Sequence, residues 1–511
     1  MEPTSVLEQI DFALVRRFPV DFLLRHHFFP FREDERTLWV WMPDPGDLQA
    51  LSVIEGHVGK RVLPRQVGEE VLDQLFKRVD AYTEVLSRKT GQYLAQQEEE
   101  GDGDERVITL ESLSDGDSSV VQLLNNLIFT AVTKRASDIH LEAKERELVV
   151  KYRIDGILVS PMAPLGGEVL SPLLTRLKVL AELDIAERRI PQDGRFRLRF
   201  RNKTIDFRLS VLPGVFGENA VIRILDREMV TRSLEDLSLA TLGFSDDLIE
   251  QMDHHIRLPY GMFLVTGPTG SGKTTSLYAA LNAIRSKEEK VVTIKDPVEY
   301  QMEGVLQIPV NEKKGLTFAR GLRSILRHDP DRIMVGEIRD PETAQIAIQS
   351  ALTGHMVYTT VHANNVFDVL GRFIHMGVDA YSFVSALSCI LAQRLVRTLC
   401  PHCRRPVHVT EQELLAHRLR PGQVPEPLYE PVGCTACNGV GFLGRTAIGE
   451  ILELSDTVKE MILERKPTSE IRKVAMAEGM IPIRRNGLMK VARAQTTLSE
   501  LDRVTAREWL V

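Results

Sequence analysis

The sequence predicts an α/β fold built around a parallel sheet, with an α+β domain and a small globular domain before it. The parallel sheet is expected from about residue 240 onward, where short apolar runs alternate with longer stretches of helical periodicity. Four runs have the length and composition of strands: Met262–Val265, Val291–Ile294, Ile333–Val335 and Val357–Thr360. Short apolar strands between helices are typical of a parallel sheet that is buried on both faces.

The α+β domain is predicted over residues 120–235. A helix is expected from about Val120 to Lys134, and three later segments alternate apolar and polar side chains. These segments are Leu148–Ile154, Phe196–Phe200 and Ile205–Ser210. Alternation with a period of two residues indicates half-buried strands, so we expect an antiparallel sheet in this domain.

Composition divides the rest of the chain into further parts. Residues 1–95 are rich in Leu, Val and Phe, and the helical periodicity of Val71–Phe76 predicts a small globular domain. Residues 96–119 begin with the acidic run Gln96–Glu105 and predict a flexible linker, because such a segment has little to bury. The remaining parts are a parallel-sheet core over residues 236–398, a cysteine-bearing insert over 399–440 and a helical C-terminal region over 441–511.

The bulk composition disfavours several classes of protein. The 511 residues are 43% hydrophobic and 26% charged, which is ordinary for a globular protein. The net charge of −7 disfavours non-specific binding to nucleic acid, which requires a basic surface. No apolar run approaches the length of a membrane span, and no secretory signal is visible after Met1. We therefore expect a cytoplasmic protein that reaches any membrane through a partner.

A phosphate-binding loop is predicted between the first of the four strands and the helix after it. Residues 267–274 match the pattern G-x-x-x-x-G-K-[ST], and the strand–loop–helix context disfavours a glycine-rich turn that matches by chance. The helix N-terminus and backbone N–H groups of such a loop bind phosphate oxygens. We expect Lys273 at the β- and γ-phosphates and the Thr274 hydroxyl at Mg²⁺. The predicted nucleotide-binding residues are Gly267, Pro268, Thr269, Gly270, Ser271, Gly272, Lys273, Thr274 and Thr275.

Acidic residues and histidines follow the other predicted strands. Glu337 comes just after the third strand, where we expect it on the Mg²⁺ side of a nucleotide; a solvent-facing acid is the alternative. Asp296 and Glu299 follow the second strand, and Glu299 is the better candidate for the general base. His355 and His362 flank the fourth strand, and we expect one of them to sense the γ-phosphate, although a lone strand-end histidine is usually structural.

Four of the five cysteines form two Cys-x-x-Cys pairs. They are Cys400, Cys403, Cys434 and Cys437. Two such pairs offer four thiolates to one tetrahedral Zn²⁺, and four protein ligands would make the site structural. A redox pair is the weaker alternative, because neither pair opens a helix in a βαβ unit. The fifth, Cys389, is expected to be a core residue.

Several segments together resemble a known family. They are Ala136–Glu142, Gly267–Thr274, Thr293–Tyr300, Thr317–Arg327, Ile333–Asp340, Thr353–Asn364 and Leu391–Cys400. Over roughly residues 120–511 the chain resembles the secretion ATPase superfamily of type II secretion and type IV pilus systems, and within it the general secretion pathway protein E family. Three positions depart from the family pattern. Lys295 stands where an acid is usual, and Val361 and Ala363 stand beside an unchanged His362.

The resemblance implies a fold, an assembly and two further sites. It implies a RecA-like P-loop ATPase domain after a PAS-like α+β domain, and a hexamer with the nucleotide held between these domains. Arg208 and Arg223 match family arginines that contact the phosphates, and a guanidinium can neutralise charge on a transferring phosphoryl group. Without the resemblance, a salt-bridged strand arginine would be the default interpretation of either. The resemblance also implies that the cysteine insert binds Zn²⁺.

The function that follows from the resemblance is ATP hydrolysis that drives pseudopilus assembly and protein export by a type II secretion system. The implied cofactors are ATP, Mg²⁺ and Zn²⁺. The implied partners are the cytoplasmic domain of an inner-membrane secretion protein of the general secretion pathway L type, bound by residues 1–95, and the polytopic platform protein of the F type. We therefore expect a cytoplasmic protein that these partners attach to the inner membrane.

Three other functions remain as alternatives. A type IV pilus extension ATPase shares the cysteine insert, but the short N-terminal region favours the secretion branch. A RecA-like nucleic-acid translocase would need a basic, aromatic-rich binding stretch, which the sequence lacks. A nucleotide-gated scaffold with little turnover is disfavoured by Glu299 and Glu337.

Overall fold

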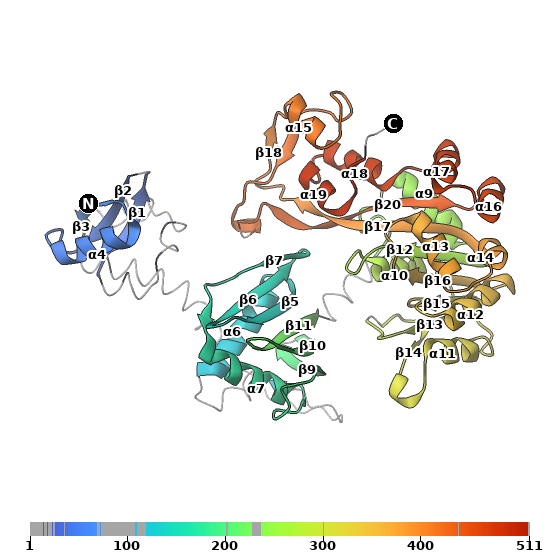
Figure 1. Cartoon of the computed structure of the whole chain (residues 1–511), viewed down its shortest axis with the longest axis horizontal. Coiled ribbons are helices and arrows are strands. Elements are labelled where there is room, and N and C mark those ends of the chain that lie inside the picture. Colours follow the sequence, from blue (N-terminus) through green and yellow to red (C-terminus); the bar gives the residue numbers. More distant parts are fainter. Residues whose placement is uncertain are drawn as a thin grey trace. The chain divides into compact units, whose positions relative to one another are not determined.

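The computed structural model describes residues 14, 18, 23, 26–34, 36–68, 72, 108–109, 119–200, 203–226, 237–299, 301–437 and 439–508. The chain forms two compact units. The first comprises residues 1–127 with 199–202, and the second comprises residues 128–198 with 203–511. Figure 1 labels the helices and strands of both units along the chain.

The first unit contains a three-stranded sheet and one helix. β1 (Phe29–Glu33) pairs antiparallel with β2 (Thr37–Met42), and β2 pairs parallel with β3 (Arg61–Gln66). A parallel pair needs a crossover connection, which α4 (Leu48–Val58) supplies. All four elements contribute to one apolar core, whose buried members include Phe31, Trp41, Ile54 and Val62.

Two predictions for the N-terminal part lie outside the described residues. Of the helical segment Val71–Phe76, only Leu72 is described, and it is buried. Of the predicted linker 96–119, the described residues are β4 (Ile108–Thr109) and Ser119, the first residue of α6. Both predictions therefore stay predictions.

An antiparallel sheet opens the second unit, with the strand order β9-β10-β11-β5-β6-β7. The pairings β10–β11, β11–β5, β5–β6 and β6–β7 are antiparallel, as predicted. The three predicted strands lie within β6, β9 and β10. The elements are α6 (Ser119–Thr133), which begins in the first unit, β5 (Ala136–Ala143), β6 (Glu147–Ile154), β7 (Ile157–Val159), β8 (Leu165–Gly166), α7 (Leu170–Leu180), β9 (Gln192–Phe200), β10 (Lys203–Gly214) and β11 (Gly217–Asp226).

A seven-stranded sheet positions the candidate site, with the order β14-β13-β15-β16-β12-β17-β20. Its strands are β12 (Gly261–Thr266), β13 (Val291–Lys295), β14 (Val305–Pro309), β15 (Arg332–Val335), β16 (Met356–Val361), β17 (Leu387–Leu399) and β20 (Phe442–Glu453). Every pairing is parallel except that of β17 with β20. The predicted parallel sheet is confirmed, and the four predicted strands lie within β12, β13, β15 and β16. Because these strands are parallel, the segments that follow them meet at one edge.

Helices cover both faces of this sheet (Figure 1). Met262 and Leu264 of β12 belong to one apolar core and Phe263 and Val265 to another, because successive side chains of a strand point to opposite faces. The first core includes residues of α11 (Phe318–Ile325), α12 (Pro341–Leu352), α13 (Val366–His375) and α14 (Ala380–Ala386), and the second includes residues of α9 (Asp246–Ile256) and α10 (Lys273–Ile284). Within the described ranges, no helix is long and apolar enough to cross a membrane.

The C-terminal region differs from the helical region predicted over residues 441–511. Its first element is β20, which pairs with β17 at the edge of the sheet. Ile451 of β20 packs into one core and Leu452 into the other, so this apolar run is a two-sided strand and not a helix. Four helices then follow: α16 (Asp456–Leu463), α17 (Thr468–Ala477), α18 (Ile483–Ala492) and α19 (Leu498–Val504).

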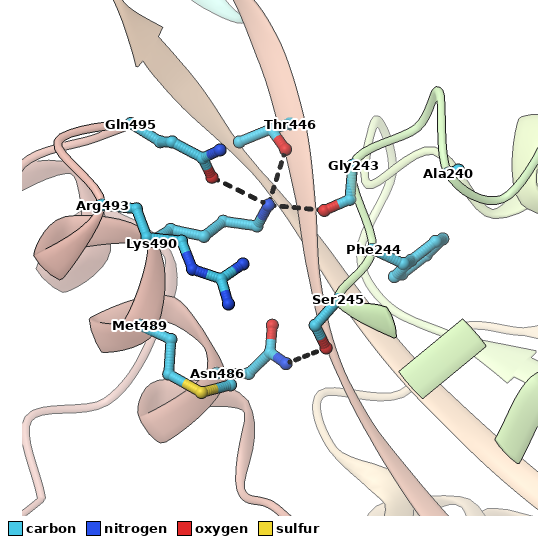
Figure 2. A pocket seen from close by; sticks show the side chains of 10 residues that line it. All are labelled: Ala240, Gly243, Phe244, Ser245, Thr446, Asn486, Met489, Lys490, Arg493 and Gln495. Carbon is cyan, nitrogen blue, oxygen red and sulfur yellow. Dashed lines mark hydrogen bonds between the residues drawn. The ribbon is translucent and has the colours of Figure 1, made fainter. Parts of the chain in front are cut away.

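Lys490 of α18 ties the C-terminal helices to the segment before α9 (Figure 2). Its Nζ donates hydrogen bonds to the Gly243 carbonyl oxygen, to Thr446 Oγ1 at 2.9 Å and to Gln495 Oε1 at 3.4 Å. Burial lowers the pKa of Lys490 to about 8. These residues line a small cavity of about 190 Å³. Three neutral acceptors therefore take the place of a carboxylate partner for this buried ammonium.

Candidate active site

The loop after β12 has a backbone conformation that favours glycine at three positions. The φ angles of Gly267, Gly270 and Gly272 are 150°, 78° and 87°, a region that other residues rarely adopt. A Cβ atom at Gly267 would also lie 2.6 Å from the carbonyl oxygen of Gln393. Gly272 directly precedes α10, so the loop ends at a helix N-terminus, where backbone N–H groups and the helix dipole favour an anion.

Lys273, the first residue of α10, is buried and lies against this loop. Its Nζ donates hydrogen bonds to the carbonyl oxygens of Gly267 at 2.7 Å and Pro268 at 3.1 Å. Burial lowers the pKa of Lys273 to about 8, and the charge of Glu337 opposes this shift. The two carbonyl groups are neutral partners, whereas a phosphate oxygen at this loop would give the buried ammonium a negatively charged one.

Glu337 and His362 lie next to Lys273 at the same edge of the sheet. His362 Nδ1 is 3.5 Å from Lys273 Nζ, and His362 Nε2 is 3.5 Å from Glu337 Oε2. The backbone before Glu337 is fixed by the Thr360 hydroxyl, which donates to the Gly336 carbonyl oxygen at 2.7 Å. Burial and the charge of Lys273 lower the pKa of His362. The arrangement places the imidazole of His362 between the predicted phosphate lysine and the acid Glu337.

The structure separates the two histidines that flank β16. His362 follows the strand and lies at the phosphate-binding loop, as described above. His355 precedes the strand, and its Nδ1 lies 3.0 Å from the carbonyl oxygen of Ser350. Because β16 is six residues long, about 20 Å of extended chain separates its two ends. Of the pair, only His362 is therefore a candidate to sense a γ-phosphate.

Glu299 reaches the site through a lysine. Lys295 Nζ lies 3.3 Å from Glu299 Oε2 and 3.4 Å from the Thr274 hydroxyl oxygen. The predicted base and the predicted magnesium-binding hydroxyl are thus held by one ammonium group. Asp296 directly follows Lys295, and its peptide bond to Pro297 is cis.

The oxygen atoms of this edge suit a hard divalent cation such as the Mg²⁺ that accompanies a nucleotide. The candidates are the Thr274 hydroxyl and the carboxylates of Glu299 and Glu337. Glu337 Oε2 is buried and accepts no hydrogen bond from the described residues, and its nearest ion-pair partner among these residues is His362 Nε2 at 3.5 Å. Hydroxyl and carboxylate oxygens are the ligands that Mg²⁺ prefers in proteins.

The four paired cysteines come together in the insert that connects β17 to β20 in sequence. Their Sγ atoms all lie within 4.8 Å of one another, and the pairs Cys400–Cys434, Cys403–Cys437 and Cys434–Cys437 are 3.8 Å apart. Four thiolates that surround a zinc ion at about 2.3 Å in tetrahedral geometry lie about 3.8 Å from one another. The cluster therefore has the dimensions of a metal site with four sulfur ligands.

Backbone N–H groups favour the thiolate form of one of these cysteines, Cys437. The N–H groups of Cys434 and Gly441 each lie 3.1 Å from Cys437 Sγ. Burial opposes ionisation, yet these donors lower the pKa of the Cys437 thiol to about 6. Between the two pairs, the insert contains β18 (Arg405–Val407), α15 (Glu411–Ala416) and β19 (Leu428–Glu430). Cys389 lies apart from the cluster, fully buried in β17, as predicted for a core residue.

Comparisons with known proteins agree with this geometry. The family described as "Type II/IV secretion system protein" matches residues 113–503, and the MshEN domain matches residues 7–86. The chain belongs to the type II/IV secretion system protein family. It is 45% identical over 397 residues to the type II secretion system protein E of Aeromonas hydrophila, an alignment that covers 77% of each chain. With the loop, lysine and acids described above, membership of this family makes the chain a secretion ATPase.

This secretion ATPase is also similar to a pilus assembly ATPase in sequence and to a further ATPase in fold. It is 37% identical over 500 residues to the type IV pilus assembly ATPase PilB of Myxococcus xanthus, covering 96% of this chain and 87% of the relative. The X-ray structure of the Legionella pneumophila ATPase DotB matches it with a TM-score of 0.53 and 20% identity, covering 78% of this chain and 99% of that one. At this identity the structural likeness supports the fold alone.

Arg208 and Arg223 are cross-strand partners in the antiparallel sheet of the secretion ATPase. Arg208 on β10 stands opposite Arg223 on β11. Arg223 Nε donates to Asp138 Oδ1 at 3.0 Å, while more than half of the Arg223 side chain stays exposed. Burial and the charge of Arg195 lower the pKa of Arg208. Both arginines line a cavity of about 860 Å³ whose lining also includes Asp296 and residues 309–313.

Gln393 supports the phosphate-binding loop, a role that the sequence analysis missed. Its Nε2 donates to the carbonyl oxygen of Ser271 at 2.7 Å, and the residue is fully buried in β17. The next residue, Arg394, donates to the carbonyl oxygen of Asn364 at 2.6 Å. The polar pair Gln393 and Arg394 inside the apolar run of β17 could have indicated a buried polar role. Only the pairing of β17 with β12 shows that Gln393 contacts the phosphate-binding loop.

Proposed function

We propose that this secretion ATPase is the hexameric motor that drives pseudopilus assembly and protein export by a type II secretion system. The convergence of candidate catalytic groups at one edge of the parallel sheet carries the proposal. These groups are Lys273, Thr274, Glu299, Glu337 and His362. Over 500 residues the chain is 40% identical to a type II secretion system protein E, against 37% over 500 residues to a pilus assembly ATPase, and this difference supports the secretion branch.

Each of these groups has one task in the proposed hydrolysis. The loop N–H groups and Lys273 bind the β- and γ-phosphates, and Thr274 and Glu337 hold Mg²⁺. When bound, the metal neutralises charge that develops on the phosphate oxygens. Glu299 accepts a proton from the water that attacks the γ-phosphorus, as the bond to the β-phosphate oxygen breaks. His362, which contacts both Lys273 and Glu337, responds to the γ-phosphate.

Arginines of the α+β domain complete the proposed site. In a hexamer, residues 120–235 and the ATPase core over residues 236–398 hold the nucleotide between them. Arg208 and Arg223 then stabilise the charge of the transferring phosphoryl group, a task for which a guanidinium is always ionised. The exposed side chain of Arg223 is available for such a contact.

The other parts of the chain have structural and docking tasks in this proposal. Residues 1–95, followed by the linker 96–119, dock to the cytoplasmic domain of an inner-membrane secretion protein of the general secretion pathway L type. The motor acts on the polytopic platform protein of the F type, and these contacts keep a cytoplasmic protein at the inner membrane. The four cysteines of the insert over residues 399–440 hold a structural Zn²⁺.

Two assays test this proposal. The specific ATPase activity should rise with protein concentration, because hexamers bring the arginines to the nucleotide. Arg223→Ala should lower turnover with little change in ATP affinity, whereas the control Arg197→Ala, in an ion pair with Asp206 on the same sheet, should leave both unchanged. Specific activity that stays constant from monomer to hexamer would contradict the assembly.

A cellular assay distinguishes a type II secretion ATPase from a type IV pilus extension ATPase. The gene should restore secretion to a type II secretion strain that lacks its ATPase. Restoration of pilus extension alone would favour the type IV pilus alternative. Strong stimulation of the ATPase by DNA would favour a nucleic-acid translocase.

A further inference from the structure

One buried cation of the site has no task in the hydrolysis proposed above. Lys295 is the last residue of β13, and its side chain is only 6% exposed. A lysine ammonium that is buried to this degree needs charged or polar partners. Its partners are unusual, because both belong to the predicted metal side of the nucleotide site.

The ammonium of Lys295 lies among the oxygen atoms that would ligate a divalent cation. Its Nζ contacts Glu299 Oε2 at 3.3 Å and Thr274 Oγ1 at 3.4 Å. Burial lowers the pKa of Lys295, and the negative charges of Glu299 and Glu337 oppose this shift. These oxygens come from three different segments, which follow β12, β13 and β15. The ammonium of Lys295 therefore interacts with the same three segments that would provide oxygen ligands to Mg²⁺.

Packing fixes the Lys295 side chain in this position. Its Nζ lies 5.0 Å from the ring centroid of Tyr278, which is fully buried in α10. Its stem passes Gly336, where an added Cβ atom would lie 3.1 Å from Lys295 Cγ. The glycine before Glu337 therefore leaves room for the lysine stem, and the aromatic ring supports the ammonium from another side. A side chain held by such contacts keeps its charge at one place in the site.

We propose that Lys295 is a resident cation of the nucleotide site, which lets this chain bind nucleoside di- and triphosphates without a divalent metal. This inference rests on the proposed nucleotide site and adds a second ammonium to it. The loop lysine, Lys273, acts from one side of the phosphates, and Lys295 acts from the side of Thr274. Because Lys295 is positive where Mg²⁺ would add positive charge, nucleotide binding depends only weakly on the metal.

The test measures the metal dependence of ADP binding, which needs no turnover. Calorimetry on the full chain gives the ADP dissociation constant in excess EDTA and in excess Mg²⁺. We expect the two constants of the wild-type chain to differ by less than about tenfold. Lys295→Met keeps the stem that packs against Gly336 but removes the charge. It should raise the ratio of the dissociation constant in EDTA to the constant in Mg²⁺ by about tenfold or more.

Two variants make the result specific. Lys295→Arg keeps the charge and should keep the wild-type ratio. Lys290→Met removes the same charge just before the opposite end of β13, from an exposed side chain, and should also leave the ratio unchanged. A thermal melt of each variant shows whether it is folded.

Several results would overturn the inference. A folded Lys295→Met chain with the wild-type ratio would make Lys295 a packing residue only. If Lys295→Met does not fold, the wild-type chain and Lys295→Arg decide the question. A wild-type chain that binds ADP about tenfold or more weakly in EDTA than in Mg²⁺ would overturn the inference. A smaller difference that Lys295→Arg retains would support it. Failure of the proposed function looks different, because a chain without any ADP binding in Mg²⁺ has no nucleotide site at all.

Discussion

The nucleotide site and the cysteine cluster both join distant parts of the sequence, but they are assembled differently. In the cluster, each Cys-x-x-Cys pair presents two thiols from one turn, and two turns 34 residues apart meet. In the nucleotide site, single side chains arrive from the ends of four strands, and the sheet ladder aligns them. We therefore expect the cluster to depend on a metal ion for its stability, whereas the nucleotide site should depend on the fold. A substitution in the nucleotide site should therefore reduce activity without unfolding the chain, whereas one in the cluster should reduce stability.

The largest effect is expected in the nucleotide site. Lys273→Ala removes the ammonium at the β- and γ-phosphates and should lower ATP hydrolysis by about a thousandfold or more. Because the sheet aligns the site, the thermal melt of the variant should stay close to that of the wild type. The control Lys290→Ala, an exposed lysine before the same β13, should retain activity. An active Lys273→Ala chain would show that the loop is not the phosphate site.

The cysteine cluster should respond in the opposite way. The wild-type chain should contain about one zinc ion, and Cys437→Ser should release it and unfold the insert, because metal binding supplies folding free energy there. ADP affinity should change little. Cys389→Ser is the matched control, since it places a hydroxyl in the core without touching the cluster. Elemental analysis that finds no zinc in fresh, reduced wild-type protein would contradict this interpretation.

Gln393 tests how far the fold supports the loop. Gln393→Ala leaves the Ser271 carbonyl oxygen without its buried donor, which costs about 1–3 kcal/mol and should weaken ADP binding by about tenfold. Gln349→Ala on the exposed side of α12 is the control. Unchanged affinity in a folded Gln393→Ala chain would mean that the loop holds its shape alone.

The smallest functional effect is expected far from both regions. Lys490→Met removes the donor of three hydrogen bonds at the joint in Figure 2 and should lower the free energy of unfolding by about 2 kcal/mol. Urea denaturation measures this loss. ADP affinity and zinc content should both stay at the wild-type values, and a change in either would show that this joint couples to a site.

The sequence predicts the local parts of this molecule well. The strands β12, β13, β15 and β16 follow from short apolar runs, and the loop and the cysteine pairs follow from fixed spacings. It does not single out the strand β20 within the predicted C-terminal region, because an apolar run of this length suits a buried helix as well as a two-sided strand. The contacts of Gln393 with Ser271 and of Lys295 with Thr274 were not predictable, since each depends on which strands become neighbours.

We propose that the edge of the parallel sheet hydrolyses ATP with Glu299 as the base. The most direct measurement compares ATP binding and hydrolysis in Glu299→Gln, with the exposed Glu303→Gln as control. The amide keeps the shape of the side chain but cannot accept the proton. Hydrolysis should fall by about a hundredfold or more while ATP binding persists. A Glu299→Gln chain that hydrolyses ATP at the wild-type rate would contradict the claim.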